Sequence, residues 1–365
     1  MKEITVEELQ TIKNPIIIDI RSPIEFKDGS IPDAINIPLF TDKEREEIGT
    51  IYKHQGQATA KWRAMEFVSP KIPALLKQIQ EAMQNGEELI IHCWRGGMRS
   101  KAVVTFLEFA GIYAMRLTGG YKAYRQYILK RIPTMIPERA VVLHGFTGVG
   151  KTEVLKNMKS HGYPILDLEE MAAHRGSIFG TIGLGEGNNQ KIFDSLLYKG
   201  LQEIQGSAYF VMEAESKRIG KAVQPEELMD KKMKGINIYI HTPIEQRVVQ
   251  LVYEYVLPYQ NEPWYHDQIS IGIEKILRRI KDQDMKKALI QTLENKDYQT
   301  MIGILLEHYY DPRYDHATLE YEGKFIDVYA DDANQASMKV MAEIDKLFVN
   351  EKEVFESITV KNRRT

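Results

Sequence analysis

The feature that most constrains the fold of this 365-residue chain is the segment at residues 145–152, Gly-Phe-Thr-Gly-Val-Gly-Lys-Thr. The segment fits the P-loop pattern without a mismatch, and it lies between a β-branched apolar run and a helical pattern. Glycines allow the backbone N–H groups of such a loop to wrap a diphosphate, and the lysine reaches phosphate oxygens. The sequence therefore predicts a strand, a phosphate-binding loop and a helix in this order.

This loop supplies the first set of predicted site residues. The predicted phosphate-binding residues are Gly145, Thr147, Gly148, Val149, Gly150, Lys151 and Thr152. The Thr152 hydroxyl is also expected to bind Mg²⁺. A P-loop recognises phosphates and not a base, so ATP, GTP and other diphosphates all remain compatible with it. The sequence leaves the identity of the ligand open.

Polar residues after the loop extend this site. Glu213 follows an apolar run and is expected to hold Mg²⁺ or orient water, and Asp167 is a rival for this role. Two further clusters are rich in anion-binding groups. Their candidate residues are His174, Arg175 and Ser177 in the first cluster, and Glu215 and Arg218 in the second. The two arginines are predicted to clamp phosphate or to neutralise a leaving diphosphate.

The rest of the chain alternates between strand and helix patterns, which predicts mostly parallel sheets. Two prolines at residues 132–139 mark a domain boundary. We predict a first domain at residues 1–132, a second at residues 139–349 and a tail at residues 350–365. Residues 41–70 are polar and look like an insertion, whereas residues 244–306 are largely helical. The predicted strands lie at residues 16–20, 88–93, 113–117, 140–145, 208–213, 236–241 and 325–330.

Composition limits the class of protein. Hydrophobic residues make up 43% of the chain and charged residues 27%, which is typical of folded soluble proteins. No apolar run is long enough to cross a bilayer, the N-terminus has no apolar signal segment, and a single cysteine cannot form an intramolecular disulfide. We expect a cytoplasmic enzyme. The net charge of −3 means that any nucleic acid must be bound by a local basic patch.

The single cysteine lies in the sequence His-Cys-Trp-Arg-Gly-Gly-Met-Arg-Ser, at residues 92–100. Because Cys93 ends a strand and precedes a helix, N–H groups and two arginines favour its thiolate, which is the nucleophilic form. The same loop is expected to bind an oxyanion such as phosphate, thiosulfate or selenophosphate. Its predicted anion-binding residues are Trp94, Arg95, Gly96, Gly97, Met98 and Arg99. The sequence thus predicts Cys93 as a catalytic nucleophile.

The first 130 residues or so resemble the rhodanese family. Its opening motif is matched by residues 16–38, its catalytic loop by the Cys93 segment, and its closing motif by Leu-Thr-Gly-Gly-Tyr at residues 117–121. The resemblance implies sulfur or selenium transfer through Cys93. Two departures argue against simple thiosulfate chemistry. Ser30 replaces the usual histidine, and the spacing from Cys93 to Arg99 is one residue longer, as in Cys-x5-Arg phosphatases.

Together the two halves resemble the tRNA 2-selenouridine synthase family. The resemblance rests on the Cys93 loop, the P-loop, the segments at residues 167–180 and 215–220, and residues 52–60. It implies an α/β protein with an N-terminal rhodanese-like parallel-sheet domain and a C-terminal P-loop NTPase-like domain with helical additions. It also implies a transferase that acts on the anticodon wobble uridine of tRNA. There 2-thiouridine is geranylated by geranyl diphosphate, and selenium from selenophosphate then replaces the geranylthio group.

On this resemblance Cys93 carries selenium as a perselenide, Arg95 and Arg99 hold selenophosphate, and the P-loop grips geranyl diphosphate. Transfer RNA also requires a basic surface. The basic candidates are Lys217, Arg218, Lys221, Lys231, Lys232, Lys234, Arg278, Arg279, Arg363 and Arg364. An extruded base would stack on an aromatic side chain, for which Trp94, Trp62 and Tyr121 are candidates, with core packing favoured for Tyr121.

Two other hypotheses remain open at this point. The first is a Cys-x5-Arg phosphatase fused to a small-molecule kinase, which requires a general acid near Cys93 that the sequence does not reveal. The second is a protein without catalysis, in which the P-loop domain is a nucleotide-gated switch and the cysteine domain a docking module. The intact Cys93 loop argues against the second hypothesis.

Overall fold

A computed structural model describes residues 1–83, 87–313 and 321–348 of the chain. Contacts divide the chain into two compact units. The first unit contains Met1–Ile132 and Lys191–Lys199, and the second contains Pro133–Gln190 and Gly200–Thr365. Residues 191–199, predicted to lie in the second domain, thus group with the first unit, although they belong to the helix α10 (Gln190–Glu203).

The first unit is built on a five-stranded parallel sheet in the order β1-β5-β4-β2-β3. Its central strands are apolar on both faces because helices cover both sides, as parallel sheets require. Ile18 of β2 pairs in register with Ile91 of β4, and both are fully buried. The strands are β1 (Lys2–Ile4), β2 (Pro15–Asp19), β3 (Ile35–Asn36), β4 (Glu88–His92) and β5 (Met115–Leu117).

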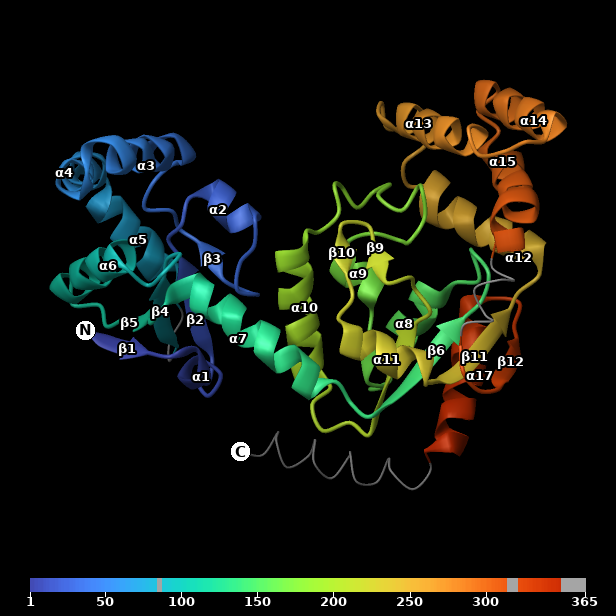
Figure 1. Cartoon of the computed structure of the whole chain (residues 1–365), viewed down its shortest axis with the longest axis horizontal. Helices are drawn as coiled ribbons and strands as arrows, with labels where there is room; N and C mark the ends of the chain where they lie inside the picture. Colours follow the sequence, from blue (N-terminus) through green and yellow to red (C-terminus); the bar gives the residue numbers. More distant parts are fainter. Residues whose placement is uncertain (84–86, 314–320, 349–365) are drawn as a thin grey trace. The chain divides into compact units, whose positions relative to one another are not determined.

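The polar insertion of the first unit forms two helices, α3 (Asp42–Gln55) and α4 (Gln57–Val68), which lie side by side (Figure 1). Thr41 and Glu44 form a capping box that starts α3, and Gly56, with φ of 90°, separates the two helices. The insertion is therefore a helical hairpin. The remaining helices are α1 (Val6–Leu9), α2 (Pro23–Lys27), η1 (Ser69–Lys71), α5 (Ile72–Ala82), α6 (Met98–Phe109) and α7 (Gly120–Met135).

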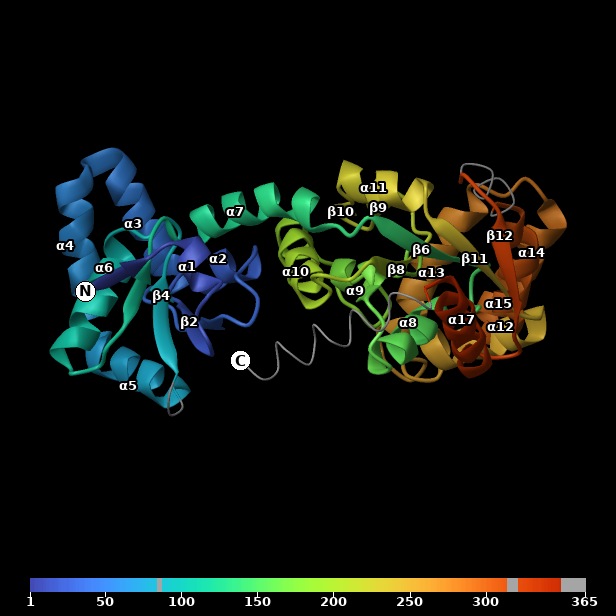
Figure 2. The same cartoon turned by 90° about the horizontal axis from the view of Figure 1, so that it is seen from below.

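The second unit contains another five-stranded parallel sheet, in the order β12-β11-β6-β8-β7. Helices α8 (Lys151–Ser160) and α17 (Ala333–Leu347) lie side by side in Figure 2, and their buried residues share one core with those of the sheet. The strands are β6 (Arg139–His144), β7 (Ile165–Leu166), β8 (Tyr209–Glu213), β11 (Ile236–His241) and β12 (Phe325–Tyr329), with a separate antiparallel pair β9 (Arg218–Ile219) and β10 (Ala222–Val223).

The predicted helical region of the second unit has its own apolar core, separate from that of the sheet. Figure 1 shows its helices α13, α14 and α15 grouped together. The other described helices of this unit are α9 (Leu168–Ala172), α11 (Glu226–Met233), α12 (Ile244–Leu251), η2 (Val252–Val256), α13 (Tyr265–Leu277), α14 (Gln283–Glu294), α15 (Tyr298–Leu305) and η3 (Leu306–Tyr310).

The predicted α/β class with two parallel sheets is confirmed. Among the described residues, no helix is both long enough and apolar enough to span a membrane.

Candidate functional site

Cys93 lies in the turn between β4 and α6, as predicted. Its side chain is only 3% exposed, and its Sγ atom lies 3.3 Å from the hydroxyl oxygen of Ser100. Ser100 is in the first turn of α6 and was not predicted as a site residue. The thiol is thus buried at the N-terminus of a twelve-residue helix and has one hydroxyl neighbour, which can donate a hydrogen bond to a thiolate.

Close backbone packing explains why the cysteine loop and the closing motif both need glycine. Gly96 has φ of 59°, and a Cβ atom there would lie 2.6 Å from the carbonyl oxygen of Leu117. At Gly120 a Cβ atom would lie 2.1 Å from the carbonyl oxygen of Cys93. The Tyr121 N–H donates to that same oxygen over 3.0 Å. The closing motif therefore holds the Cys93 backbone in place.

The two predicted anion-binding arginines of the loop have different surroundings. Arg99 makes a two-pronged ion pair with Glu25 of α2, with N···O distances of 2.6 and 3.2 Å, and is half-buried. Burial by itself would raise the pKa of the Glu25 carboxyl, but hydrogen bonds from Arg99 and its positive charge hold that pKa below its ordinary value. Arg95 is exposed. Thus Arg99 also ties the loop to α2, while Arg95 faces solvent.

The other residues of the cysteine loop differ in how far they are exposed. Gly97 and Met98 are exposed, whereas Trp94 is half-buried with its ring centroid 5.7 Å from that of Tyr121. Tyr121 is itself 1% exposed, which confirms the expectation of core packing. The guanidinium of the buried Arg21 lies 4.2 Å from the centre of the Tyr121 ring and donates to Asp19. The opening and closing motifs of the rhodanese resemblance thus meet beneath the cysteine loop.

The P-loop connects β6 to α8 as predicted. Gly145, Gly148 and Gly150 all have positive φ, and at each a Cβ atom would lie within 3.0 Å of another residue. The Lys151 ammonium arches back over the loop and donates to the carbonyl oxygen of Gly145 over 2.8 Å. Val149 points inward and is 3% exposed. The loop thus has the tight backbone that phosphate binding requires.

The carboxylate beside the P-loop hydroxyl is neither of the predicted ones. The Thr152 hydroxyl donates to Glu169 over 3.3 Å. Asp167 instead caps α9, accepting from the N–H of Glu170 over 2.8 Å, and the fully buried Glu213 accepts from the N–H of Leu168. Glu169 was missed because a strand-end carboxylate looked like the better candidate. The sequence feature that could have indicated Glu169 is its position two residues after Asp167, inside a short helix.

Burial and neighbouring negative charges raise the pKa of the Glu169 carboxyl group. Burial first, and then the charge of Glu215, raise the pKa of Glu169 to about 9. Burial also raises the pKa values of Asp167 and, strongly, of Glu213. The Glu213 Oε1 atom is buried and has no hydrogen-bond partner within the described part of the chain. These buried carboxyl groups therefore disfavour one another's ionised forms.

We predict that Glu169→Gln removes part of the pH dependence of stability. The folded-state pKa lies above the ordinary value, so the stability that this carboxyl group contributes is fully present below about pH 4.5 and is lost as the pH rises towards 9. The melting temperature of the wild type should therefore fall from pH 6 to pH 8, and that of the variant should fall roughly 5 °C less. Thermal melts at both pH values measure this, and parallel slopes would contradict it.

The two predicted anion-binding clusters pack against each other. A Cβ atom on Gly176 would lie 2.5 Å from the Glu215 carboxylate, and one on Gly220 would lie 2.8 Å from the His174 ring. Arg175 donates to the carbonyl oxygen of Ile182 and lies 3.7 Å from Glu254. Arg218 is exposed on β9. The structure thus joins the two loops but gives their arginines different surroundings.

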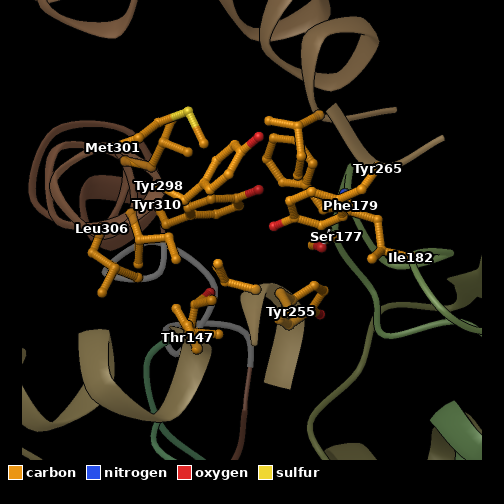
Figure 3. A pocket seen from close by; sticks show the side chains of 15 residues that line it. Thr147, Ser177, Phe179, Ile182, Tyr255, Tyr265, Tyr298, Met301, Leu306 and Tyr310 are labelled. Carbon is orange, nitrogen blue, oxygen red and sulfur yellow. Dashed lines mark hydrogen bonds between the residues drawn. The ribbon is translucent and has the colours of Figure 1, made fainter. Parts of the chain in front are cut away.

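An apolar pocket opens at the P-loop, and the sequence did not predict it. Its cavity volume is about 60 Å³, so the pocket is narrow. Figure 3 shows Thr147 of the P-loop at one side and Met301 of α15 at another, with tyrosine rings around the space. Its lining includes Ser177, Phe179, Ile182, Tyr255, Tyr265, Tyr298, Leu306 and Tyr310.

Several predicted tRNA-binding lysines are engaged by acidic neighbours. Lys217 pairs with Glu226, Lys221 with Glu186, Lys231 with Glu138 and Lys234 with Asp230. The prediction for Lys232 is wrong, because this side chain is 2% exposed and its ammonium donates to the carbonyl oxygen of Glu215. Arg278 and Arg279 are exposed, as is Trp62 at 75%. Arg363 and Arg364 lie outside the described residues.

Comparisons with known proteins give the chain its relatives. Residues 138–344 match the family model of the tRNA 2-selenouridine synthase AAA domain, and residues 5–127 match that of the rhodanese-like domain. A tRNA 2-selenouridine synthase of Sulfurovum sp. is 31% identical over 84% of this chain and 89% of its own length. One of Aeromonas salmonicida is 32% identical over 82% of this chain and 86% of its own length.

Proposed function

Because the chain belongs to the tRNA 2-selenouridine synthase family, we propose that it converts 2-thiouridine to 2-selenouridine at the wobble position of tRNA in the cytoplasm. In the first step the thiouridine sulfur attacks C1 of geranyl diphosphate, the C–O bond breaks and diphosphate leaves with the electron pair. In the second step selenium at the selenide level, supplied as selenophosphate, attacks C2 of the base; the C–S bond breaks, geranyl thiol leaves, and water takes the phosphoryl group as phosphate. The two units divide this work between the P-loop and Cys93.

The observation that carries the first step is the apolar pocket beside the P-loop. A nucleotide needs no narrow hydrocarbon pocket, whereas a prenyl diphosphate needs one within reach of its phosphates. Thr147 belongs to both the P-loop and the lining of the apolar pocket. We propose that the diphosphate binds the P-loop N–H groups and Lys151, and that the geranyl chain lies among the tyrosine and aliphatic side chains of the pocket.

The carboxyl cluster fits a bound Mg²⁺. The ion usually binds through one or two carboxylates together with phosphate oxygens, and the buried, unpartnered Glu213 Oε1 lies in such a cluster. The Thr152 hydroxyl and the Glu169 carboxylate would hold it. Bound there, it would neutralise charge on the leaving diphosphate. Lys151 supplies positive charge to the same group from the protein itself.

For the second step we propose that Cys93 is the catalytic group, with Arg95, Arg99 and the N–H groups of the loop holding selenophosphate. The helix N-terminus and the Ser100 hydroxyl stabilise negative charge at the Cys93 sulfur. Glu25 fixes Arg99 and so fixes the base of the loop.

The test of this proposal is a reconstitution with the full chain. Purified protein is incubated with 2-thiouridine tRNA, geranyl diphosphate and selenophosphate, and the digested nucleosides are identified by mass spectrometry. We expect geranylated nucleoside with geranyl diphosphate alone, and 2-selenouridine when both donors are present. Unchanged tRNA, together with release of phosphate from an aryl phosphate, would instead support a phosphatase fused to a kinase.

A larger side chain in the apolar pocket should leave room only for a donor with a shorter prenyl chain. We predict that Met301→Trp raises the KM for geranyl diphosphate roughly 10- to 100-fold, because each excluded CH₂ group forfeits about 0.8 kcal/mol of burial. The KM for a five-carbon prenyl diphosphate should change little. The ratio of the two values separates a shortened pocket from general damage. Ile271→Trp, at a position of α13 that is 54% exposed, is the matched control, and an unchanged ratio in Met301→Trp would contradict the assignment.

A further inference from the structure

A second pocket lies on the second unit beside the P-loop, and neither step of the proposed reaction uses it. It is formed where β11 and β12 end, next to the loop that follows β6. Ligands of open parallel sheets bind at such carboxyl ends. Its volume is about 560 Å³, so it is much larger than the apolar pocket. It is lined by Phe146, His241, Arg247, Tyr329, Asp331 and Lys339, among others.

Stacked aromatic rings form one wall of this pocket. The His241 ring lies 4.5 Å from the Tyr329 ring with an angle of 13° between their planes, and 4.6 Å from the Tyr239 ring. His241 Nε2 lies 2.7 Å from the Asp327 carboxylate, which fixes the orientation of the imidazole. Tyr329 ends the stack and is 66% exposed. The pocket therefore offers a prepared flat surface on which a further planar ring can stack.

The polar groups around this wall suit the edges of a neutral ring. Arg247 is 4% exposed and pairs with Asp311, yet its Nε atom has no hydrogen-bond partner within the described chain. Lys339 donates to the carbonyl oxygen of Tyr329, and Asp331 brings a negative charge to the lining. The pocket thus contains donors and acceptors with balanced charge. This balance disfavours a second phosphate and favours an uncharged group with polar edges.

We propose that this pocket is a nucleobase site, in which a base stacks on Tyr329 and its edge meets the polar groups beside it. The base could belong to the tRNA or to a free nucleotide whose phosphates lie on the P-loop, because Phe146 of the P-loop lines the same pocket. The chemistry of recognition is the same for both sources.

Equilibrium binding of three probes to the full chain tests this proposal and separates the two sources. The probes are a 2-thiouridine tRNA, ATP and GTP, all without prenyl or selenium donor. Since stacking on an aromatic side chain contributes about 1–3 kcal/mol per base, Tyr329→Ala should weaken binding of at least one probe roughly 5- to 100-fold. Tyr329→Phe should retain binding, because the ring is kept.

The pattern of loss identifies the source of the base. If Tyr329→Ala weakens tRNA binding alone and Lys151→Ala does not, the base belongs to the RNA. If both variants weaken ATP or GTP binding, the base belongs to a nucleotide on the P-loop. Tyr253→Ala, at a position that is 69% exposed in the same unit and outside both pockets, is the matched control. The proposal is overturned if no probe binds Tyr329→Ala more weakly than this control. The assay needs no catalysis, so a failure of the proposed reaction would leave its outcome unchanged, whereas a nucleotide on the P-loop would compete with the proposed prenyl diphosphate.

Discussion

Cys93→Ala should abolish formation of 2-selenouridine and leave the geranylated nucleoside as the end product. Removing a catalytic nucleophile costs roughly a thousandfold or more in rate, so the selenium product should fall below detection in the reconstitution. On the proposed division of work, geranylation uses the other unit and should keep its wild-type rate. Mass spectrometry of the digested tRNA reports both nucleosides in one measurement.

The sequence allows two specific controls for this experiment, namely labelling of the thiol and substitution of a neighbouring hydroxyl. Cys93 is the single cysteine of the sequence, so a thiol reagent reports on this residue alone. The reaction should be slow, because Cys93 is only 3% exposed. Ser100→Ala removes the hydroxyl 3.3 Å from the sulfur and should slow the selenium step less than loss of the sulfur does. If Cys93→Ala still forms 2-selenouridine at the wild-type rate, selenium transfer to the tRNA does not depend on this cysteine. The proposed division of work between the two units is then wrong.

Local sequence patterns predicted the elements that carry both loops. The apolar runs at residues 16–20, 88–93 and 140–145 form β2, β4 and β6 within a residue or two of their predicted ends. Such runs are readable because a central parallel strand is buried on both faces. The short strands β3 and β7, of two residues each, were not predicted. Two residues are too few to show a pattern, and only their neighbours in the sheet define them.

The missed site residues depend on contacts that no local pattern contains. Lys231, Lys232 and Lys234 read as one solvated basic cluster, but one turn of α11 places Lys232 in the interior. The apolar pocket combines Thr147, Phe179, Tyr265 and Met301, which are brought together only by the packing of the helical additions on the P-loop unit. Helical periodicity predicted those helices, but it could not show which of their faces would meet.

The structure also changes what the predicted residues are expected to do. Asp167 and Glu213 were rivals for Mg²⁺, yet the first caps α9 and the second lies buried behind it. Both lie close to Glu169, as their strand-end positions suggested, but the backbone hydrogen bonds of the α9 N-terminus decide their geometry. Glu169 therefore takes the place beside Thr152.

Lys151→Ala should have the opposite effect to Cys93→Ala, namely loss of geranylation with the selenium step intact. The ammonium of Lys151 already lies over the P-loop, 2.8 Å from the Gly145 carbonyl oxygen, so a bound diphosphate would meet a positioned positive charge. Removing one such group from a leaving-group site costs roughly 100- to 1,000-fold in rate. Geranylated nucleoside should therefore nearly disappear from the reconstitution, and 2-selenouridine with it.

Supplying the intermediate separates this defect from misfolding. Geranylated tRNA isolated from the Cys93→Ala reaction should be converted to 2-selenouridine by Lys151→Ala at close to the wild-type rate, because Cys93 and its loop are unchanged. Lys156→Ala, an exposed lysine on the same helix α8, is the matched control and should geranylate normally. If Lys151→Ala geranylates tRNA as fast as this control, the P-loop does not hold the prenyl donor, and the apolar pocket beside it needs another occupant.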